Sequence, residues 1–308
     1  MKRLTIGSRR SALAQAQSHL VRQMLLAAWP DLTVTIELID TTGDLNRRDP
    51  LPVIGGKGLF TAELEAALRQ RRIDLAVHSL KDLPVEDSPG LSVLAIPERG
   101  ATEDVLISRQ ATSLADLPAG AVIGTSSLRR AAQLLAVRPD LQIRDIRGNV
   151  DTRLAKIDDP ATGYSGTLLA LAGLTRLGHE TLPQVHPLPH TVMLPAPGQG
   201  ALAVQGRVDD PETAPYLAVL DHAASRAAVT AERAFLAGLG GGCSLPVAAL
   251  GQITEGTIEL QALVADPTGR NILRFAGKDR LERAEALGRS LAQQALSQGA
   301  TTLFLVEP

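Results

Sequence analysis

The sequence predicts an α/β fold of two α/β lobes, followed by a smaller C-terminal α+β domain with an antiparallel sheet. Short apolar runs of β type alternate with amphipathic helical stretches through most of the chain. After about residue 215, strand-like runs follow one another with few helices between them. The 308 residues, 44% of them hydrophobic, are enough for two or three globular domains.

The first lobe is expected to begin with a strand at 4–6 and a helix over 11–29, which Pro30 ends. Apolar residues of that helix, among them Leu13 and Leu20, fall on one face. A strand over 33–39 follows. The polar segment 40–58 reads as a long loop, and loops of that length are often functional. A helix over 61–72 and a strand over 73–77 complete the series.

The later elements are predicted in the same way. We expect helices at 128–136 and 150–157, a strand at 143–146, a helix at 230–239, strands near 247–253, 258–264 and 272–275, a helix at 280–297 and a final strand at 302–306. Candidate boundaries lie near 98–103, where Pro97, Gly100 and charged residues cluster, and near 195–200. The predicted domains are lobe 1 (1–98 with 200–217), lobe 2 (103–195) and the C-terminal domain (220–308).

Composition excludes several classes of protein. The 31 Lys and Arg against 33 Asp and Glu give a net charge of −2, and aromatics are 2%. This argues against a basic, base-stacking nucleic-acid surface, although a local basic groove remains compatible with it. No apolar run approaches the ~20 residues of a membrane span, and none follows the first charged residues as in a signal peptide. We therefore expect a cytoplasmic protein.

Two residue types are unevenly used. Five lysines leave 26 arginines among the 31 cations, and Arg binds carboxylates or phosphates bidentately, although a GC-rich genome produces the same bias. Cys243 is the single cysteine, so no internal disulfide forms. It follows three glycines that leave the backbone open to a ligand. A reactive or modified thiol and an inert buried one are both compatible with this.

Three segments share one design, in which a short strand leads through Arg and small polar residues into a helix. They are 6–11, 123–130 and 143–149. Helix N-termini bind anions, although Ser or Thr in such a place is equally often an ordinary helix cap. Together, the three favour an anion-binding cleft between two α/β lobes. At the end of another strand, Asp82 follows Lys81. Alone this is a surface ion pair, but in such a cleft Asp82 is suited to stabilising a cation.

Other motifs fail their templates. Residues 55–58 lack the first glycine and the hydroxyl of a P-loop, and residues 238–243 follow a helix and lack the last glycine of a dinucleotide fingerprint. His186 and His190 are separated by prolines that forbid a helix, so we expect no metal site.

Seven segments in order resemble the porphobilinogen deaminase family, over essentially the whole chain. They are SRRSALA (8–14), GGKGLF (55–60), VHSLKDLP (77–84), GTSSLRR (124–130), RGN (147–149), PGQGA (197–201) and GGC (241–243). The resemblance implies a monomeric transferase that joins four porphobilinogen molecules head to tail. Each addition releases ammonia, and the product is hydroxymethylbilane, a precursor in tetrapyrrole biosynthesis. It also implies two lobes like those of type II periplasmic binding proteins, plus a third domain that bears the cysteine.

The resemblance also assigns residues. A dipyrromethane cofactor would be attached to Cys243 by a thioether and held by Ser11, Lys81, Asp82, Thr125, Ser127, Arg129 and Arg130. Porphobilinogen or the growing chain would be bound by Arg9, Gln17, Arg147, Arg153 and Arg176. Asp82 would be catalytic: it would hydrogen-bond pyrrole N–H groups and stabilise the cation left when ammonia departs.

Two other functions compete with this interpretation. A non-catalytic two-lobed protein that binds a carboxylate or phosphate explains the Arg-rich helix starts equally well, but it leaves the glycine-flanked Cys243 unexplained. An RNA-binding protein requires steep salt-dependent binding, and the acidic balance disfavours it.

Overall fold

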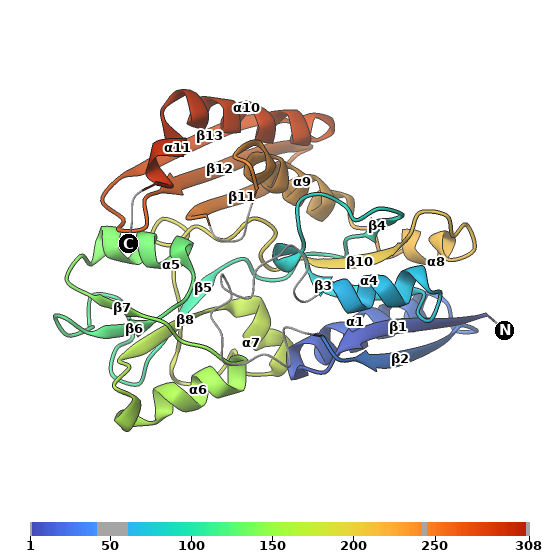
Figure 1. The fold of residues 1–308 in the computed structure, drawn as a ribbon, viewed down its shortest axis with the longest axis horizontal. Coiled ribbons are helices and arrows are strands. Elements are labelled where there is room, and N and C mark those ends of the chain that lie inside the picture. The colour runs from blue at the N-terminus through green and yellow to red at the C-terminus, as the bar shows by residue number, and fades with distance from the viewer. Residues whose placement is uncertain (1, 42–60, 242–244, 306–308) are drawn as a thin grey trace. The chain divides into compact units, whose positions relative to one another are not determined.

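The computed structural model describes residues 2–41, 61–241 and 245–305. The chain forms two compact units, which Figure 1 shows as a ribbon coloured along the chain. Unit 1 comprises residues 1–100 and 201–226, and unit 2 comprises residues 101–200 and 227–308. The chain thus passes from one unit to the other three times.

Unit 1 is built on a five-stranded sheet in the order β2-β1-β3-β10-β4. Its strands are β1 (Arg3–Arg9), β2 (Thr33–Ile39), β3 (Leu75–Ser79), β4 (Leu91–Ala95) and β10 (Leu202–Arg207). Its helical elements are α1 (Ala12–Ala28), α4 (Ala62–Arg69), the short 3₁₀ turn η1 (Leu80–Asp82) and α8 (Ala214–Ala218). Strands β1, β2 and β3 are parallel, whereas β10 lies antiparallel between β3 and β4. All six residues of β10 are buried.

Unit 2 contains a second five-stranded sheet, in the order β7-β6-β8-β5-β9. Its strands are β5 (Asp104–Ile107), β6 (Val122–Gly124), β7 (Gln142–Arg144), β8 (Gly166–Ala170) and β9 (Val185–Pro187). The helices of this region are α5 (Leu128–Val137), α6 (Val150–Asp158), the 3₁₀ turn η2 (Pro160–Thr162) and α7 (Leu171–Leu177). Here β5 is the inserted antiparallel strand. The two sheets therefore have the same spatial arrangement of strands, although the inserted strand comes last in the chain in unit 1 and first in unit 2.

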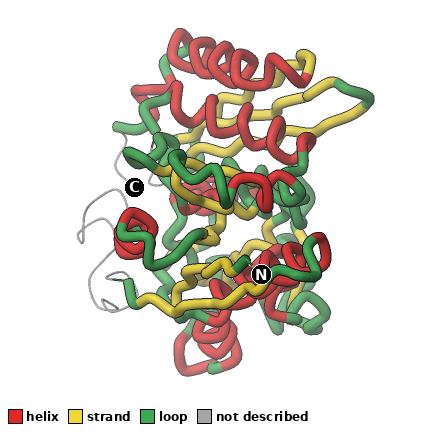
Figure 2. The backbone as a smooth tube through the Cα atoms, turned by 90° about the vertical axis from the view of Figure 1, so that its right-hand side faces the viewer, coloured by secondary structure: helices red, strands yellow, loops and turns green. Residues whose placement is uncertain are grey.

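A three-stranded antiparallel sheet completes unit 2. It consists of β11 (Val247–Thr254), β12 (Thr257–Ala265) and β13 (Ile272–Arg280), followed by the 3₁₀ turn η3 (Leu281–Arg283), α10 (Ala284–Ser297) and α11 (Ala300–Leu303). Helix α9 (Ala223–Gly238) precedes it. Figures 1 and 2 show α10 running along this sheet, with helices red and strands yellow in Figure 2.

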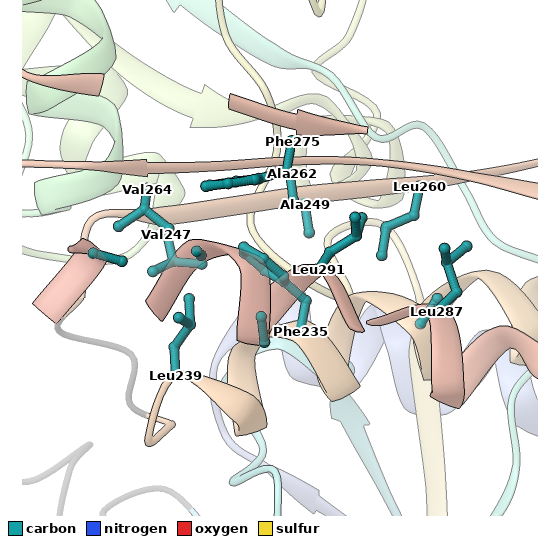
Figure 3. Packing of buried hydrophobic residues seen from close by; sticks show 14 of the residues in the cluster. Phe235, Leu239, Val247, Ala249, Leu260, Ala262, Val264, Phe275, Leu287 and Leu291 are labelled. Atoms are coloured by element: carbon teal, nitrogen blue, oxygen red, sulfur yellow. The ribbon is translucent and has the colours of Figure 1, made fainter. Parts of the chain in front are cut away.

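The two faces of this small sheet are covered differently. On one face, the rings of Phe235 (α9) and Phe275 (β13) lie 6.3 Å apart in the apolar cluster drawn in Figure 3, which includes Leu287 and Leu291 of α10. On the other face, a second apolar cluster joins residues of β11 and β12 to Ala132 of α5. Residues alternate between the faces, as the period of a strand requires.

The predicted fold class is confirmed: two α/β lobes of the type II periplasmic-binding form accompany a small antiparallel sheet. The bounds predicted for the three domains stay predictions.

The final strand expected at 302–306 is wrong where the structure describes it, because residues 300–303 are helical. Gly299 there adopts φ +84°, which turns the chain so that Ala300 is buried, and this packing overrides the β propensity of the threonines. Most of the predicted loop 40–58 lies outside the described residues.

Within the described part of the chain, no helix is both long and apolar enough to span a bilayer.

Candidate functional site

In unit 1, Asp82 ends the turn η1, directly after the buried strand β3. Its side chain is exposed, and Lys81 beside it is partly buried. The turn is anchored by Leu80, whose side chain is 1% exposed. The Leu80 amide donates to the Ala201 carbonyl at 3.0 Å, and the Leu83 amide closes the turn on the Leu80 carbonyl at 3.1 Å. An acid is thus presented to solvent from a fixed backbone.

Helix α1 lies next to this turn. Ser11 caps the helix and accepts from the Ala14 amide at 3.4 Å, and the partly buried Arg9 precedes it. Gln17, predicted to bind substrate, is 3% exposed, and its Nε2 donates to Ser79 Oγ at 2.7 Å. The structure therefore brings Gln17 against the segment that carries Asp82.

His78 of β3 is the first of three buried polar side chains that are linked by hydrogen bonds. Its Nε2 lies 3.1 Å from Gln205 Oε1, and Gln205 Nε2 donates to Glu65 Oε1 at 3.5 Å. Burial, aided by the charge of Arg9, lowers the pKa of His78 to about 4, against opposing effects of Gln205 and Glu65. The imidazole is therefore neutral at pH 7, and its carbonyl partner requires the proton to be on Nε2.

In unit 2, Arg129 and Arg130 of α5 converge on Asp104, which is fully buried at the start of β5. Arg129 Nη1 donates to Asp104 Oδ2 at 2.7 Å, and Arg130 donates from Nε (3.1 Å) and Nη2 (2.7 Å) to Oδ1. Burial opposes ionisation of Asp104, but the two guanidinium charges outweigh it and hold its pKa below the usual value. Two cations thus share one buried anion.

The turn at 197–200 ties this network to two further charged groups. Gln199 Nε2 donates to Asp104 Oδ1 at 3.0 Å and to the Thr102 carbonyl at 2.8 Å. The Gly198 amide donates to Glu232 Oε2 of α9 at 2.7 Å, and Arg176 Nη2 donates to the Gly200 carbonyl at 2.6 Å. Both glycines have positive φ, which other residues rarely adopt.

Arg153 of α6 lies within electrostatic reach of two other arginines, Arg130 and Arg147. Arg153 Nε donates to the Gly148 carbonyl at 3.0 Å. Burial, together with the positive charges of Arg130 and Arg147, lowers the pKa of Arg153 to about 10. Burial also lowers the pKa of Arg176 to about 10. Arg153 therefore stays charged at pH 7 and is repelled by the like charges of Arg130 and Arg147, and an anion bound beside it would relieve that repulsion.

Hydroxyl groups and helix N-termini supply donors in the same unit. Ser127 caps α5, accepting from the Arg130 amide at 3.4 Å, and Thr125 Oγ1 accepts from the Ser127 amide at 3.2 Å. Asn149 caps α6 and accepts from the Thr152 amide at 2.9 Å. Guanidinium groups, hydroxyls and helix N-termini form an anion-binding donor set. These residues fit a ligand that carries several carboxylates, as a dipyrromethane does.

The structure groups the predicted site residues into two sets, one in each unit. Unit 1 holds Arg9, Ser11, Gln17, Lys81 and Asp82, and unit 2 holds Thr125, Ser127, Arg129, Arg130, Arg147, Arg153 and Arg176. Cys243, predicted to anchor the cofactor, lies outside the described residues. Among the residues that are described, no group of three His, Cys, Asp or Glu is arranged to hold a metal ion.

Sequence reasoning missed Ser79, Asp104, Gln199 and Glu232 as individual residues. Ser79 and Gln199 stand inside recognised segments, so their neighbours were the available signal. Asp104 had a fainter signal, because it is an acid at the edge of the apolar run 105–107. An acid in that place has to find a cationic partner when the strand is buried.

A fold of this kind, with paired α/β sheets and polar groups at the ends of their strands, defines a ligand-binding α/β protein. A family model described as "Porphobilinogen deaminase, dipyromethane cofactor binding domain" matches residues 4–215, and one described as "Porphobilinogen deaminase, C-terminal domain" matches residues 226–297. The chain belongs to the porphobilinogen deaminase family, as the sequence resemblance predicted.

Curated relatives agree with the family match. A porphobilinogen deaminase of Acidothermus cellulolyticus is 48% identical over 305 residues, covering 98% of this chain and 91% of the relative. One of Desulforudis audaxviator is 48% identical over 299 residues, covering 97% and 96%. Among solved structures, the methionine-binding protein MetQ matches with a TM-score of 0.42 and 12% identity, over 71% of this chain and 88% of MetQ. That last similarity is too low to bear on function.

Proposed function

We propose that this protein is a hydroxymethylbilane synthase: it condenses four porphobilinogen molecules head to tail, releases ammonia at each addition and so serves tetrapyrrole biosynthesis. Membership of the porphobilinogen deaminase family carries the proposal. The arginine and hydroxyl donor set of unit 2 supports it independently, because every pyrrole added brings an acetate and a propionate that need cationic partners.

The family model is named for a dipyromethane cofactor, and the donor set described above suits its carboxylates. When bound, this group supplies the pyrrole carbon to which the first porphobilinogen is joined. We assign its attachment to the thiol of Cys243. We assign the binding of its carboxylates to Ser11, Lys81, Thr125, Ser127, Arg129 and Arg130, with Asp82 facing its pyrrole N–H groups.

The guanidinium groups of Arg9, Arg147, Arg153 and Arg176 are proposed to bind the carboxylates of porphobilinogen and of the growing chain. Hydrogen bonds to charged groups contribute about 1.5–3 kcal/mol each. The half-buried Arg153 is the best placed of the described four, since its guanidinium already carries the cost of desolvation and of two like charges.

Asp82 is proposed to be the catalytic residue. Ammonia leaves porphobilinogen with the bonding electrons, so positive charge develops on the pyrrole that stays behind. An exposed carboxylate on a rigid turn can accept the pyrrole N–H and stabilise that charge. It can also take up the proton that the attacked ring carbon releases.

We further propose that the enzyme acts as a monomer in the cytoplasm. Its single cysteine, which allows no internal disulfide, supports a reducing compartment.

Intact-mass analysis of the purified protein, combined with an assay of porphobilinogen consumption, tests this function. The expected mass exceeds that of the chain by two pyrrole units, and Cys243→Ser should lose both the excess mass and the activity. Active protein with the bare chain mass would refute the covalent cofactor. A protein that binds carboxylates but never consumes porphobilinogen would instead be a two-lobed binding protein.

A further inference from the structure

The three residues that precede Lys81 and Asp82 are each held by another segment of unit 1, two of them by β10 or the residue before it and one by α1. His78 is held by Gln205 of β10, and the Leu80 amide by the Ala201 carbonyl. Ser79, between them, is held by Gln17 of α1 at 2.7 Å. This last contact is a side-chain bond between residues 62 positions apart, whereas the other two join neighbouring strands or their ends.

The hydroxyl of Ser79 has an unusual hydrogen-bond partner for a residue that begins a turn. With φ −68° and ψ 122°, Ser79 has the extended backbone of an N-cap, but its side chain does not cap η1. It accepts from Gln17 instead. A serine at a helix start ordinarily bonds its own turn. Here a long-range partner takes that hydroxyl and so fixes the turn to helix α1.

Gln17 belongs to the buried face of α1, which also contains Ala14, Ser18, Val21 and Leu25. The spacing of three, four and seven residues places them on one side of the helix. With 3% of its surface exposed, Gln17 presents little of its amide to a ligand. A buried side-chain amide without a partner destabilises the folded state, so the hydrogen bond of Gln17 to Ser79 contributes to the stability of the fold.

We propose that Gln17 is a positioning residue, which acts on Asp82 through Ser79, and is not a substrate ligand. This inference rests on the proposed function, which assigns catalysis to Asp82 and carboxylate binding to Arg9. Because the N-cap of α1 is Ser11, two residues after Arg9, one helix links the Asp82 turn to a side chain that is proposed to bind carboxylates. Small displacements of a catalytic group lower the rate steeply, whereas substrate affinity depends on other contacts.

A double-mutant cycle of Gln17→Leu and Ser79→Ala tests the proposal. Each single variant should lower kcat for porphobilinogen about 10-fold and leave KM within about twofold, and the double variant should be no worse than either single. Ser79→Thr, which keeps the hydroxyl, should restore activity. Gln23→Leu, on the exposed face of the same helix, is the matched control and should behave as wild type.

A substrate ligand gives the opposite pattern. In that case Gln17→Leu raises KM about 10-fold, Ser79→Ala stays near wild type and the two effects add, which would overturn the proposal. Hydrogen exchange of the Leu80 and Leu83 amides provides a readout that does not depend on activity. Both variants should accelerate it, and unchanged exchange would also overturn the proposal. If wild type fails to consume porphobilinogen while exchange responds as expected, the proposed function fails and the Gln17–Ser79 coupling stands.

Discussion

The two five-stranded sheets have equivalent spatial arrangements of strands but carry different side chains where equivalent strands end. In unit 1, the third parallel strand runs into the turn that presents Asp82. In unit 2, the equivalent strand β8 leads directly into α7 at Leu171, with no acid at its end. One sheet thus offers an anion to solvent, and the other surrounds its helix starts with guanidinium groups.

The arginine pairs show how such a difference arises from similar sequence. In unit 1, Arg9 and Arg10 precede the helix cap, and the exposed Arg10 pairs with Asp40 at 2.5 Å. In unit 2, Arg129 and Arg130 follow the cap, so they lie in the first turn of α5 and are buried on Asp104. When the two arginines lie after the capping residue instead of before it, their ion pairs are buried on Asp104, whereas the Arg10–Asp40 ion pair is exposed.

Replacement of Asp82 should have the largest effect and test whether the anion of unit 1 is the catalytic one. Asp82→Asn removes the charge without changing the shape, so porphobilinogen turnover should fall about 1000-fold. The thermal midpoint should not change, because Asp82 is exposed. Asp87→Asn, another exposed acid of unit 1, is the control and should retain turnover within twofold. Near-normal turnover of Asp82→Asn would refute the assignment.

Replacement of Asp104 tests the internal charges of unit 2. Asp104→Asn leaves two buried guanidinium groups without their anion, and we expect a loss of about 3–5 kcal/mol in the free energy of unfolding by urea. Asp158→Asn breaks the exposed pair with Arg109 and should cost less than about 1 kcal/mol. Equal costs for the two variants would show that the Asp104 network contributes no more to stability than an exposed ion pair.

Replacement of His78 should have the smallest of the three effects, a change in how the free energy of unfolding depends on pH. Its pKa is about 4 when folded and near the ordinary value of 6.5 when unfolded, so between these values the unfolded chain binds more protons. Stability should therefore fall as pH drops below about 6.5, by about 2 kcal/mol between pH 7 and pH 5. His78→Gln should flatten that part of the urea-unfolding profile, whereas His19→Gln, exposed on α1, should leave it as in wild type. An unchanged profile in His78→Gln would contradict the neutral buried imidazole.

The sequence was sufficient where a local pattern decides the structure. The spacing of apolar residues indicated α1, and Ser11 and Ser127 are the caps that their positions suggest. The long antiparallel strands of the C-terminal sheet were also evident from consecutive apolar runs. Family motifs then supplied the candidate site residues, of which Asp82 is exposed whereas Gln17 and Arg129 are buried.

Pairings between distant residues could not be predicted. Nothing near Gln17 indicates that its partner is Ser79, and nothing near Arg129 indicates Asp104, because tertiary packing alone brings each pair together. The same limit explains the helix at 300–303, where burial of Ala300 outweighs the β-branched threonines.

The insertion of β10 between β3 and β4 has a consequence for synthesis on the ribosome. β4 ends at residue 95 and β10 begins at residue 202, a delay of roughly 5–20 s at ~5–20 residues per second. All five strands of the other sheet, from β5 to β9, are translated during that interval. The first sheet to be started is thus the last of the two to be completed. Until then the edges of β3 and β4 with which β10 will pair stay open, and unpaired strand edges favour pairing with other chains.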